Sequence, residues 1–202
     1  MEHRTLHMKN MKIREENGKR YLNGHFAVFN EPYEVFPGWI ETIAPGAFDR
    51  ALSSGQDIKV LWNHNTDIVM GSTANRTARL WQDEIGLPGD VEINEEDQAA
   101  KDGYARVSRG DVTGCSFGFD ISRMEESWDD DGTYRTRILE VFPLYEVSPC
   151  TFPAYTQTNI SARAKEQLER AKEQLKEAKE KRKNQWKRSM IQKLKGGNAS
   201  GT

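Results

Sequence analysis

The sequence predicts a mixed α+β domain: a closed or nearly closed, mostly antiparallel β-barrel of short strands with inserted helices, followed by an extended C-terminal helix. Between residues 20 and 155, short alternating runs are separated by turn residues, which is the pattern of many short strands. Two helical patterns interrupt the strands without alternating regularly with them, which favours a barrel over a doubly wound sheet. The last part of the chain instead repeats every seven residues.

The expected strands are short runs rich in aromatic and branched residues. They occupy residues 20–30, 39–43, 57–65, two runs within 77–93, and the runs on either side of residues 129–132. Residues 129–132 read Asp-Asp-Asp-Gly, and an Asp-Gly pair between alternating runs is a strong hairpin signal. Residues 31–38 contain proline and glycine, so we interpret them as a loop.

Two helices are expected within the barrel. In residues 44–55, Phe48 and Leu52 are four positions apart and Gly55 is placed to end the helix. Residues 94–110 begin with acidic residues and end with arginines and a glycine, as the helix dipole favours. An internal glycine, Gly103, argues against one unbroken helix.

Residues 161–195 predict one long helix that projects from the barrel and makes few contacts with it. The segment has no proline or glycine and is rich in Ala, Glu, Lys, Gln and Leu. Its apolar seam consists of Ala164, Leu168, Ala171, Leu175 and Ala178. One interpretation is a solvated helix held by charge pairs four residues apart; the other is a coiled coil or a helix that binds a partner.

Composition divides the chain into unlike parts. Of its 202 residues, 36% are hydrophobic and 30% are charged, with a net charge of −2. Residues 161–202 carry a net charge of +8 and the remainder −10, so the two parts are expected to do different jobs. We expect a flexible N-terminus at residues 1–12, a barrel domain at 13–160, the helix at 161–195 and a flexible tail at 196–202.

No apolar run is long enough to cross a membrane, and the charged N-terminus lacks the apolar core of a secretory signal. Cys115 and Cys150 are therefore expected to remain thiols in a reducing compartment. A soluble intracellular protein without a membrane partner follows as the expectation.

Metal and cofactor sites are not expected. The four histidines lack metal-ligand spacing, the cysteines form no CxxC pair, and no glycine-rich loop of the phosphate-binding type is present. Trp186 is the lone aromatic residue of the basic C-terminal segment, so no specific nucleic-acid partner is expected.

Covalent catalysis remains, because the stretch VTGCSFGFD at 112–120 places Cys115 directly beside Ser116. Either nucleophile needs a base within hydrogen-bonding reach, and histidine is the usual base near neutral pH. His64 ends an apolar strand between two asparagines, which is where sheet proteins often carry a site. Taken singly, His64 is equally an ordinary edge histidine, Ser116 a small residue between close strands, and Glu146 a surface carboxylate.

Five segments in a fixed order make the pattern more specific. They are GHFAVFNEPYE, ETIAPGAFDRAL, VLWNHN, SRGDVTGCSFGF and LYEVSPCTFPAYTQTNI. With them, residues 12–163 resemble the tailed-bacteriophage prohead (capsid maturation) serine proteases, whose fold is similar to that of the herpesvirus assemblins. The resemblance implies an assemblin-like barrel here.

The resemblance also implies residue roles. The histidine of the NH motif falls on His64 as general base, and the serine of the SFGF motif falls on Ser116 as nucleophile. The acid that orients the base falls on Glu146, with Asp67 and Glu41 as competing candidates; assemblins use a second histidine there. Because side chains alternate along a strand, Cys115 would face the other way, although a cysteine nucleophile stays open as an alternative.

The function that the resemblance implies is a serine endopeptidase that cleaves the scaffold part of the major capsid protein, and itself, inside the procapsid in the host cell cytoplasm. Its partners would be the capsid protein and its scaffold segment, and a homodimer is left open. Backbone amides around residues 158–163 would be candidate oxyanion donors. The alternative is a catalytically inactive scaffold or assembly protein on the same fold.

Overall fold

A computed structural model describes residues 2–7, 9–151 and 157–196 of the chain. It divides into two compact units, Met1–Gln157 and Thr158–Thr202. Most of the tail expected at 196–202 lies outside the described residues.

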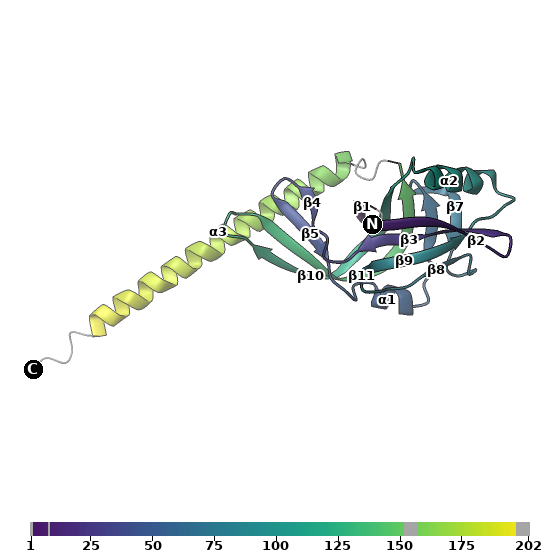
Figure 1. The fold of residues 1–202 in the computed structure, drawn as a ribbon. Coiled ribbons are helices and arrows are strands. Elements are labelled where there is room, and N and C mark those ends of the chain that lie inside the picture. The colour runs from purple at the N-terminus through teal and green to yellow at the C-terminus, as the bar shows by residue number, and fades with distance from the viewer. Residues whose placement is uncertain (1, 8, 152–156, 197–202) are drawn as a thin grey trace, which may run out of the picture. The chain divides into compact units, whose positions relative to one another are not determined.

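The first unit contains eleven described strands and two helices (Figure 1). The strands are β1 (Glu2–His7), β2 (Lys9–Glu16), β3 (Lys19–Val28), β4 (Tyr33–Phe36), β5 (Trp39–Ile43), β6 (Lys59–Trp62), β7 (Asn65–Ser72), β8 (Ala78–Leu80), β9 (Gly86–Glu92), β10 (Gly114–Trp128) and β11 (Tyr134–Cys150). The helices are α1 (Asp49–Ser53) and α2 (Gln98–Arg109).

The strands form two sheets. The larger has the order β1-β10-β11-β5-β4, with β6 pairing with β11 and β7; the smaller has the order β2-β3-β9-β8. Most pairs are antiparallel, whereas β11 pairs in parallel with both β5 and β6. The prediction of a strand-rich, mostly antiparallel α+β unit is confirmed.

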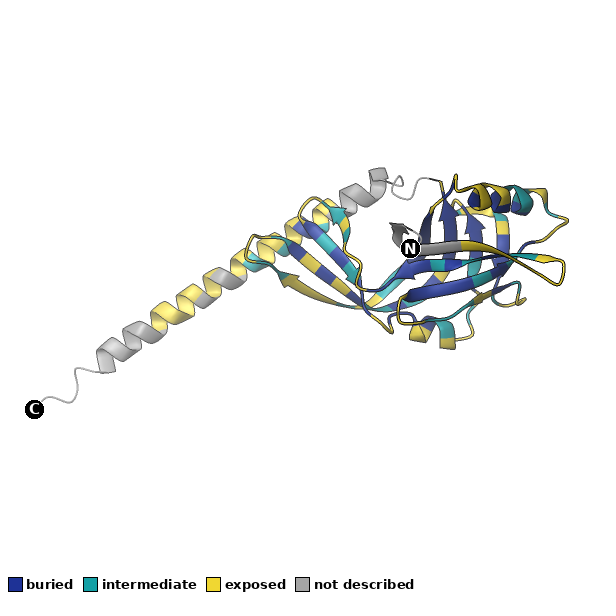
Figure 2. Ribbon diagram, viewed as in Figure 1, coloured by how far each residue is buried: buried dark blue, intermediate teal, exposed yellow. Residues whose placement is uncertain are grey.

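The prediction of a closed barrel is wrong. Closure requires hydrogen bonds between the first and last strands of one sheet. Among the described residues, no ladder joins the two sheets, and each sheet keeps its own edge strands. The sheets instead share one core, to which Phe26 and Leu87 of the smaller sheet and Phe117 and Ile138 of the larger sheet contribute. Figure 2 shows buried residues, in dark blue, along the strands of this unit.

Helix α2 ends at the predicted glycine but begins at Gln98, four residues later than predicted, so the acidic residues expected in its first turn precede the helix. Asp97 is its N-cap and accepts a hydrogen bond from the Ala99 amide at 2.8 Å, and Gly110 ends it with a left-handed φ of 84°. The internal Gly103 has a packing reason, because a β-carbon there would lie 3.0 Å from the Trp62 ring and 3.1 Å from Met70. The helix therefore lies close to β6 and β7.

The expected hairpin turn at 129–132 joins β10 to β11. The Gly132 amide donates to the Asp129 carbonyl at 3.0 Å, and Gly132 has a φ of 87°. Glycine adopts this left-handed backbone without the clash that a β-carbon would cause.

Three stretches differ from expectation. Residues expected to form a flexible N-terminus are strands β1 and β2, which pair with β10 and β3. The expected loop at 31–38 contains β4, which pairs with β5, and β7 was not predicted. Strands β1 and β2 have polar sequences, and β1 pairs with β10, which is remote in the chain, so the local sequence does not reveal them.

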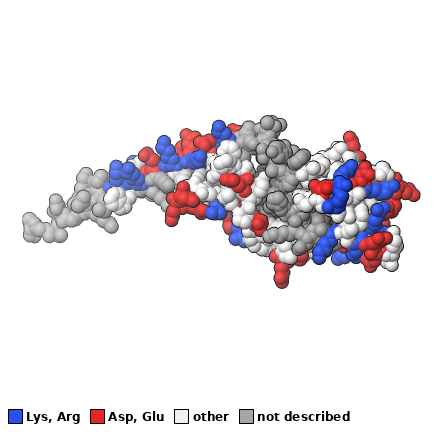
Figure 3. Space-filling view, turned by 45° about the horizontal axis from the view of Figure 1, so that its top comes forward, with Lys and Arg blue, Asp and Glu red and all other residues white. Residues whose placement is uncertain are grey.

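The second unit contains helix α3 (Gln157–Gly196). The helix predicted at 161–195 lies within it. Its described side chains form ion pairs three or four residues apart, including Arg170 with Glu166 at 2.5 Å and Lys172 with Glu169 at 3.1 Å. Figure 3 shows both signs of charge interspersed along it. No helix among the described residues is both long and apolar enough to span a bilayer.

Candidate active site

His64 lies at the tip of the hairpin between β6 and β7. The two-residue turn consists of Asn63 and His64, with φ values of 51° and 60°. Positive φ at both positions is the geometry of a type I′ turn, which asparagine and glycine favour. Histidine is costly at the second position, so a side chain is held there at the expense of backbone strain.

The end of β11 holds this turn. The Asn63 amide donates to the Pro149 carbonyl at 3.1 Å, and the Asn63 side chain both accepts from the Thr151 amide at 2.8 Å and donates to the Thr151 hydroxyl at 3.2 Å. The His64 amide donates to the Ser148 hydroxyl at 3.2 Å. These four hydrogen bonds fix where the imidazole leaves the backbone.

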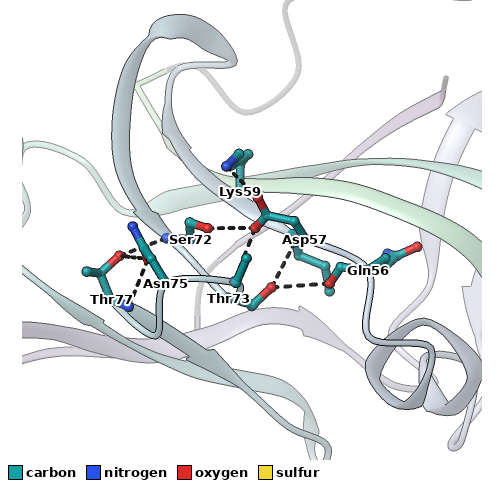
Figure 4. Close-up of polar contacts among 9 residues, drawn as sticks. Gln56, Asp57, Lys59, Ser72, Thr73, Asn75 and Thr77 are labelled. Atoms are coloured by element: carbon teal, nitrogen blue, oxygen red, sulfur yellow. Dashed lines mark hydrogen bonds and ion pairs between the residues drawn. The ribbon is translucent and has the colours of Figure 1, made fainter.

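The other end of the same hairpin is held by a polar cluster centred on Asp57 (Figure 4). Its carboxylate accepts from the Ser72 hydroxyl at 2.6 Å and pairs with Lys59 at 2.5 Å. Hydrogen bonding from Lys59, and then from Ser72, holds the pKa of the Asp57 carboxyl below its usual range. The Thr73 hydroxyl accepts from the Ile58 amide at 2.8 Å. Both ends of the hairpin that carries His64 are therefore fixed.

A buried carboxylate lies beside the imidazole. Glu146 Oε1 is 2.7 Å from His64 Nδ1, and the Glu146 side chain is only 5% exposed. Its second oxygen, Oε2, accepts a hydrogen bond from the Ser148 hydroxyl. Because a carboxylate only accepts hydrogen bonds, Nδ1 is the donor in this contact, and in the neutral imidazole Nε2 then carries the lone pair. The predicted proximity of Glu146 to the His64 ring is thus present.

The register between β10 and β11 places Ser116 on the same face of the sheet as Glu146 and Ser148. On β10, Ser116 lies directly opposite Ser148 of β11, and Gly118 lies opposite Glu146. Residues that face each other across an antiparallel pair share one face of the sheet. Ser116 therefore shares a face with Glu146 and Ser148, and it is 1% exposed.

Cys115 occupies the opposite face. With Phe117 and Phe119 it belongs to the hydrophobic core and is fully buried. Burial raises the pKa of the Cys115 thiol well above its ordinary value, and burial likewise raises that of Cys150 to about 12. Both cysteines are free thiols. Since the thiolate is the nucleophilic form, neither cysteine is poised for attack.

The two competing acids lie elsewhere. Glu41 is on β5, opposite Thr136 near the start of β11, and accepts from the Thr136 hydroxyl at 3.3 Å. Asp67 is exposed on β7. Residues 158–163, considered for oxyanion donors, form the first turns of α3 instead of a loop.

Sequence reasoning did not single out Ser148 or Asn63. The alternation in Glu-Val-Ser-Pro places Glu146 and Ser148 on one face, which could have indicated Ser148. A second histidine–carboxylate pair was also missed: His25 Nε2 lies 2.8 Å from Asp83. Asp83 also accepts from the Ile85 and Gly86 amides, both at 2.8 Å, so it organises the turn before β9.

Comparison with known proteins identifies the family of the chain. Residues 7–174 match the family described as caudovirus prohead serine protease, so the chain belongs to that family. It is 31% identical to the prohead protease of Enterobacteria phage HK97 over 155 aligned residues. These aligned residues make up 75% of this chain. The chain spans 64% of the length of that relative. No solved structure matches.

Proposed function

We propose that this chain is a serine endopeptidase in which Ser116 is the nucleophile, His64 the general base and Glu146 the acid that orients it. The observation that carries the proposal is the 2.7 Å contact between His64 Nδ1 and buried Glu146, beside a serine on the adjacent strand of the same face. A nucleophile, a base and an orienting acceptor are the three parts that acyl transfer needs.

In this mechanism the Ser116 hydroxyl oxygen attacks the scissile carbonyl while Nε2 of His64 takes its proton. Glu146 stabilises the resulting imidazolium through Nδ1–H. The tetrahedral intermediate collapses as His64 gives the proton to the leaving amine, which leaves an acyl-enzyme on Ser116. Water then attacks the acyl carbon with His64 again as base, releasing the acid and restoring the serine.

The substrate we propose is the scaffold part of the major capsid protein, with the protease itself as a second substrate. Family membership supports this choice, and it implies action within the procapsid in the host cell. Confinement with many copies of the substrate gives a high effective concentration, so that modest affinity suffices.

We propose that α3 recruits the enzyme to this assembly. The segment 161–202 carries the excess positive charge of the chain, whereas the rest is acidic. An exposed basic helix suits an acidic or helical scaffold partner. A homodimer through the Ala/Leu seam is less favoured, because two Leu/Ala repeats bury little apolar surface.

Co-expression tests the proposal. The chain is produced with its major capsid protein, and the products are followed by mass spectrometry. We expect the intact chain to remove the scaffold part, and Ser116→Ala and His64→Ala to leave the capsid protein whole. Unprocessed capsid protein with the intact chain would instead favour an inactive assembly protein.

A further inference from the structure

Ser116 is buried although the rest of its site is assembled. The His64–Glu146 contact is formed, yet Ser116 is only 1% exposed. A peptide bond cannot reach a nucleophile in that state. Some element beside Ser116 must therefore move before a substrate binds.

Both edges of β10 are occupied at this point. On one side Ser116 lies opposite Ser148 of β11, and on the other it lies opposite Thr5 of β1. Strand β11 carries Glu146 and Ser148, so it cannot leave without dismantling the site. Strand β1 is the neighbour that can be removed while the site stays intact.

Strand β1 is suited to leave. It has six residues and is the outermost strand of its sheet as far as the structure describes the chain. Its sequence, Glu-His-Arg-Thr-Leu-His, contains one apolar residue among six. Terminal segments with few apolar contacts are the first to open in folded proteins.

The edge left behind would fit an extended peptide. Without β1, the backbone groups of residues 114–119 become an unpaired strand edge, which an incoming strand can complete. Such a strand would regain the backbone hydrogen bonds lost with β1 and would lie directly beside Ser116.

We propose that β1 is an internal occupant of the substrate-binding edge of β10, and that the chain is latent until an extended peptide segment displaces it. This inference rests on the proposed protease function. The ligand class is a polypeptide in extended conformation, recognised mainly through its backbone along residues 114–119.

A reversible lock tests the proposal in the full chain. Leu6 lies opposite Cys115, so Leu6→Cys allows a cross-strand disulfide that ties β1 to β10 when the chain is refolded under oxidising conditions, in which Cys115 is accessible before it is buried. The readout is the rate at which a fluorophosphonate labels Ser116, because this needs only an accessible, activated serine. We expect the cross-linked form to lose labelling and to regain it on reduction, while the unsubstituted chain is insensitive to oxidant and reductant.

A proline pair tests the opposite direction. Backbone N–H groups of neighbouring residues on an edge strand point alternately toward and away from the partner strand, so Arg4→Pro and Thr5→Pro are matched controls for each other. One of them should raise the labelling rate by roughly tenfold, the factor expected when one or two backbone hydrogen bonds are lost from a closed state. The other should leave the rate unchanged.

The two experiments control for each other. A disulfide that only distorted the site would lower the labelling rate, but this distortion could not explain a higher labelling rate in a proline variant. Equal labelling rates in the locked, reduced and proline forms, with unchanged circular dichroism, would overturn the role of β1 alone. No labelling in any form would overturn the protease function together with it.

Discussion

Nδ1 of His64 lies 2.7 Å from Oε1 of Glu146, although 82 positions separate the two residues in the chain. The contact exists because β6 and β11 are parallel neighbours, with Lys59 opposite Glu146, and because the hairpin after β6 folds His64 back toward β11. A buried carboxylate thereby meets a histidine that is 18% exposed. The position of Glu146 is therefore fixed by the sheet, and that of His64 by the hairpin turn.

Glu146→Gln should lower kcat on a peptide substrate by about 10⁴-fold, as loss of the orienting acid does in a comparable triad. The amide keeps the size of the side chain but can donate to Nδ1, which favours the wrong imidazole tautomer. The matched control is Glu41→Gln, which changes another buried carboxylate, on β5. If Glu41→Gln abolished activity and Glu146→Gln retained it, the orienting role would belong to Glu41.

The positive φ of His64 is expected to lower the stability of the folded protein. His64→Gly should be more stable than His64→Ala by about 1 kcal/mol, because glycine accepts a φ of 60° without steric cost whereas alanine does not. Both variants lose the same imidazole contacts, so their difference isolates the backbone. Chemical denaturation gives the two free energies of unfolding, and equal values would mean that the turn stores no strain.

Much of this arrangement could be read from the sequence. Alternation and turn residues identified β3, β5, β6, β9 and the β10–β11 hairpin, because these signals are local. The late arginines and the terminal glycine similarly marked the end of α2, whereas its start at Gln98 lies after the acidic residues that were expected to begin it. The order of five motifs then pointed to His64, Ser116 and Glu146.

The remainder depends on pairing between distant segments. Whether a set of short strands closes into a barrel or divides into two sheets is decided by which strands become neighbours, and β1 pairing with β10 has no local signal. Strand β1 is polar and β4 lies among proline and glycine, so neither resembles a strand taken alone. Alternation along β11 places Ser148 on the same face as Glu146, but the hydrogen bonds of its hydroxyl with the His64 amide and Glu146 depend on the hairpin that brings His64 to β11.

Cys115 should resist alkylation in the folded protein. Burial raises the pKa of its thiol well above the ordinary value, so the reactive thiolate is scarce near neutral pH. Iodoacetamide at pH 7 to 8 should leave both cysteines unmodified and activity intact, and should label both after unfolding, as mass spectrometry would show. Inactivation by iodoacetamide that persists in Ser116→Ala would instead identify a cysteine nucleophile.

Removal of residues 164–202 should separate catalysis from recruitment. We expect the shortened chain to cleave a short peptide with kcat and KM close to those of the full chain, while its incorporation into procapsids falls. Binding of the full chain to scaffold should also weaken with added salt, because exposed charges are screened within about 8 to 10 Å at physiological ionic strength. A shortened chain that is packaged normally but cannot cleave peptides would place the helix in the active domain.

The most direct test of the central claim is to label the native chain with a fluorophosphonate and to map the modified residue by mass spectrometry. We predict one adduct, on Ser116, and its loss in His64→Ala even though the serine remains. An adduct on another residue, or labelling of Ser116 that does not depend on His64, would contradict the assignment of these two residues as nucleophile and base.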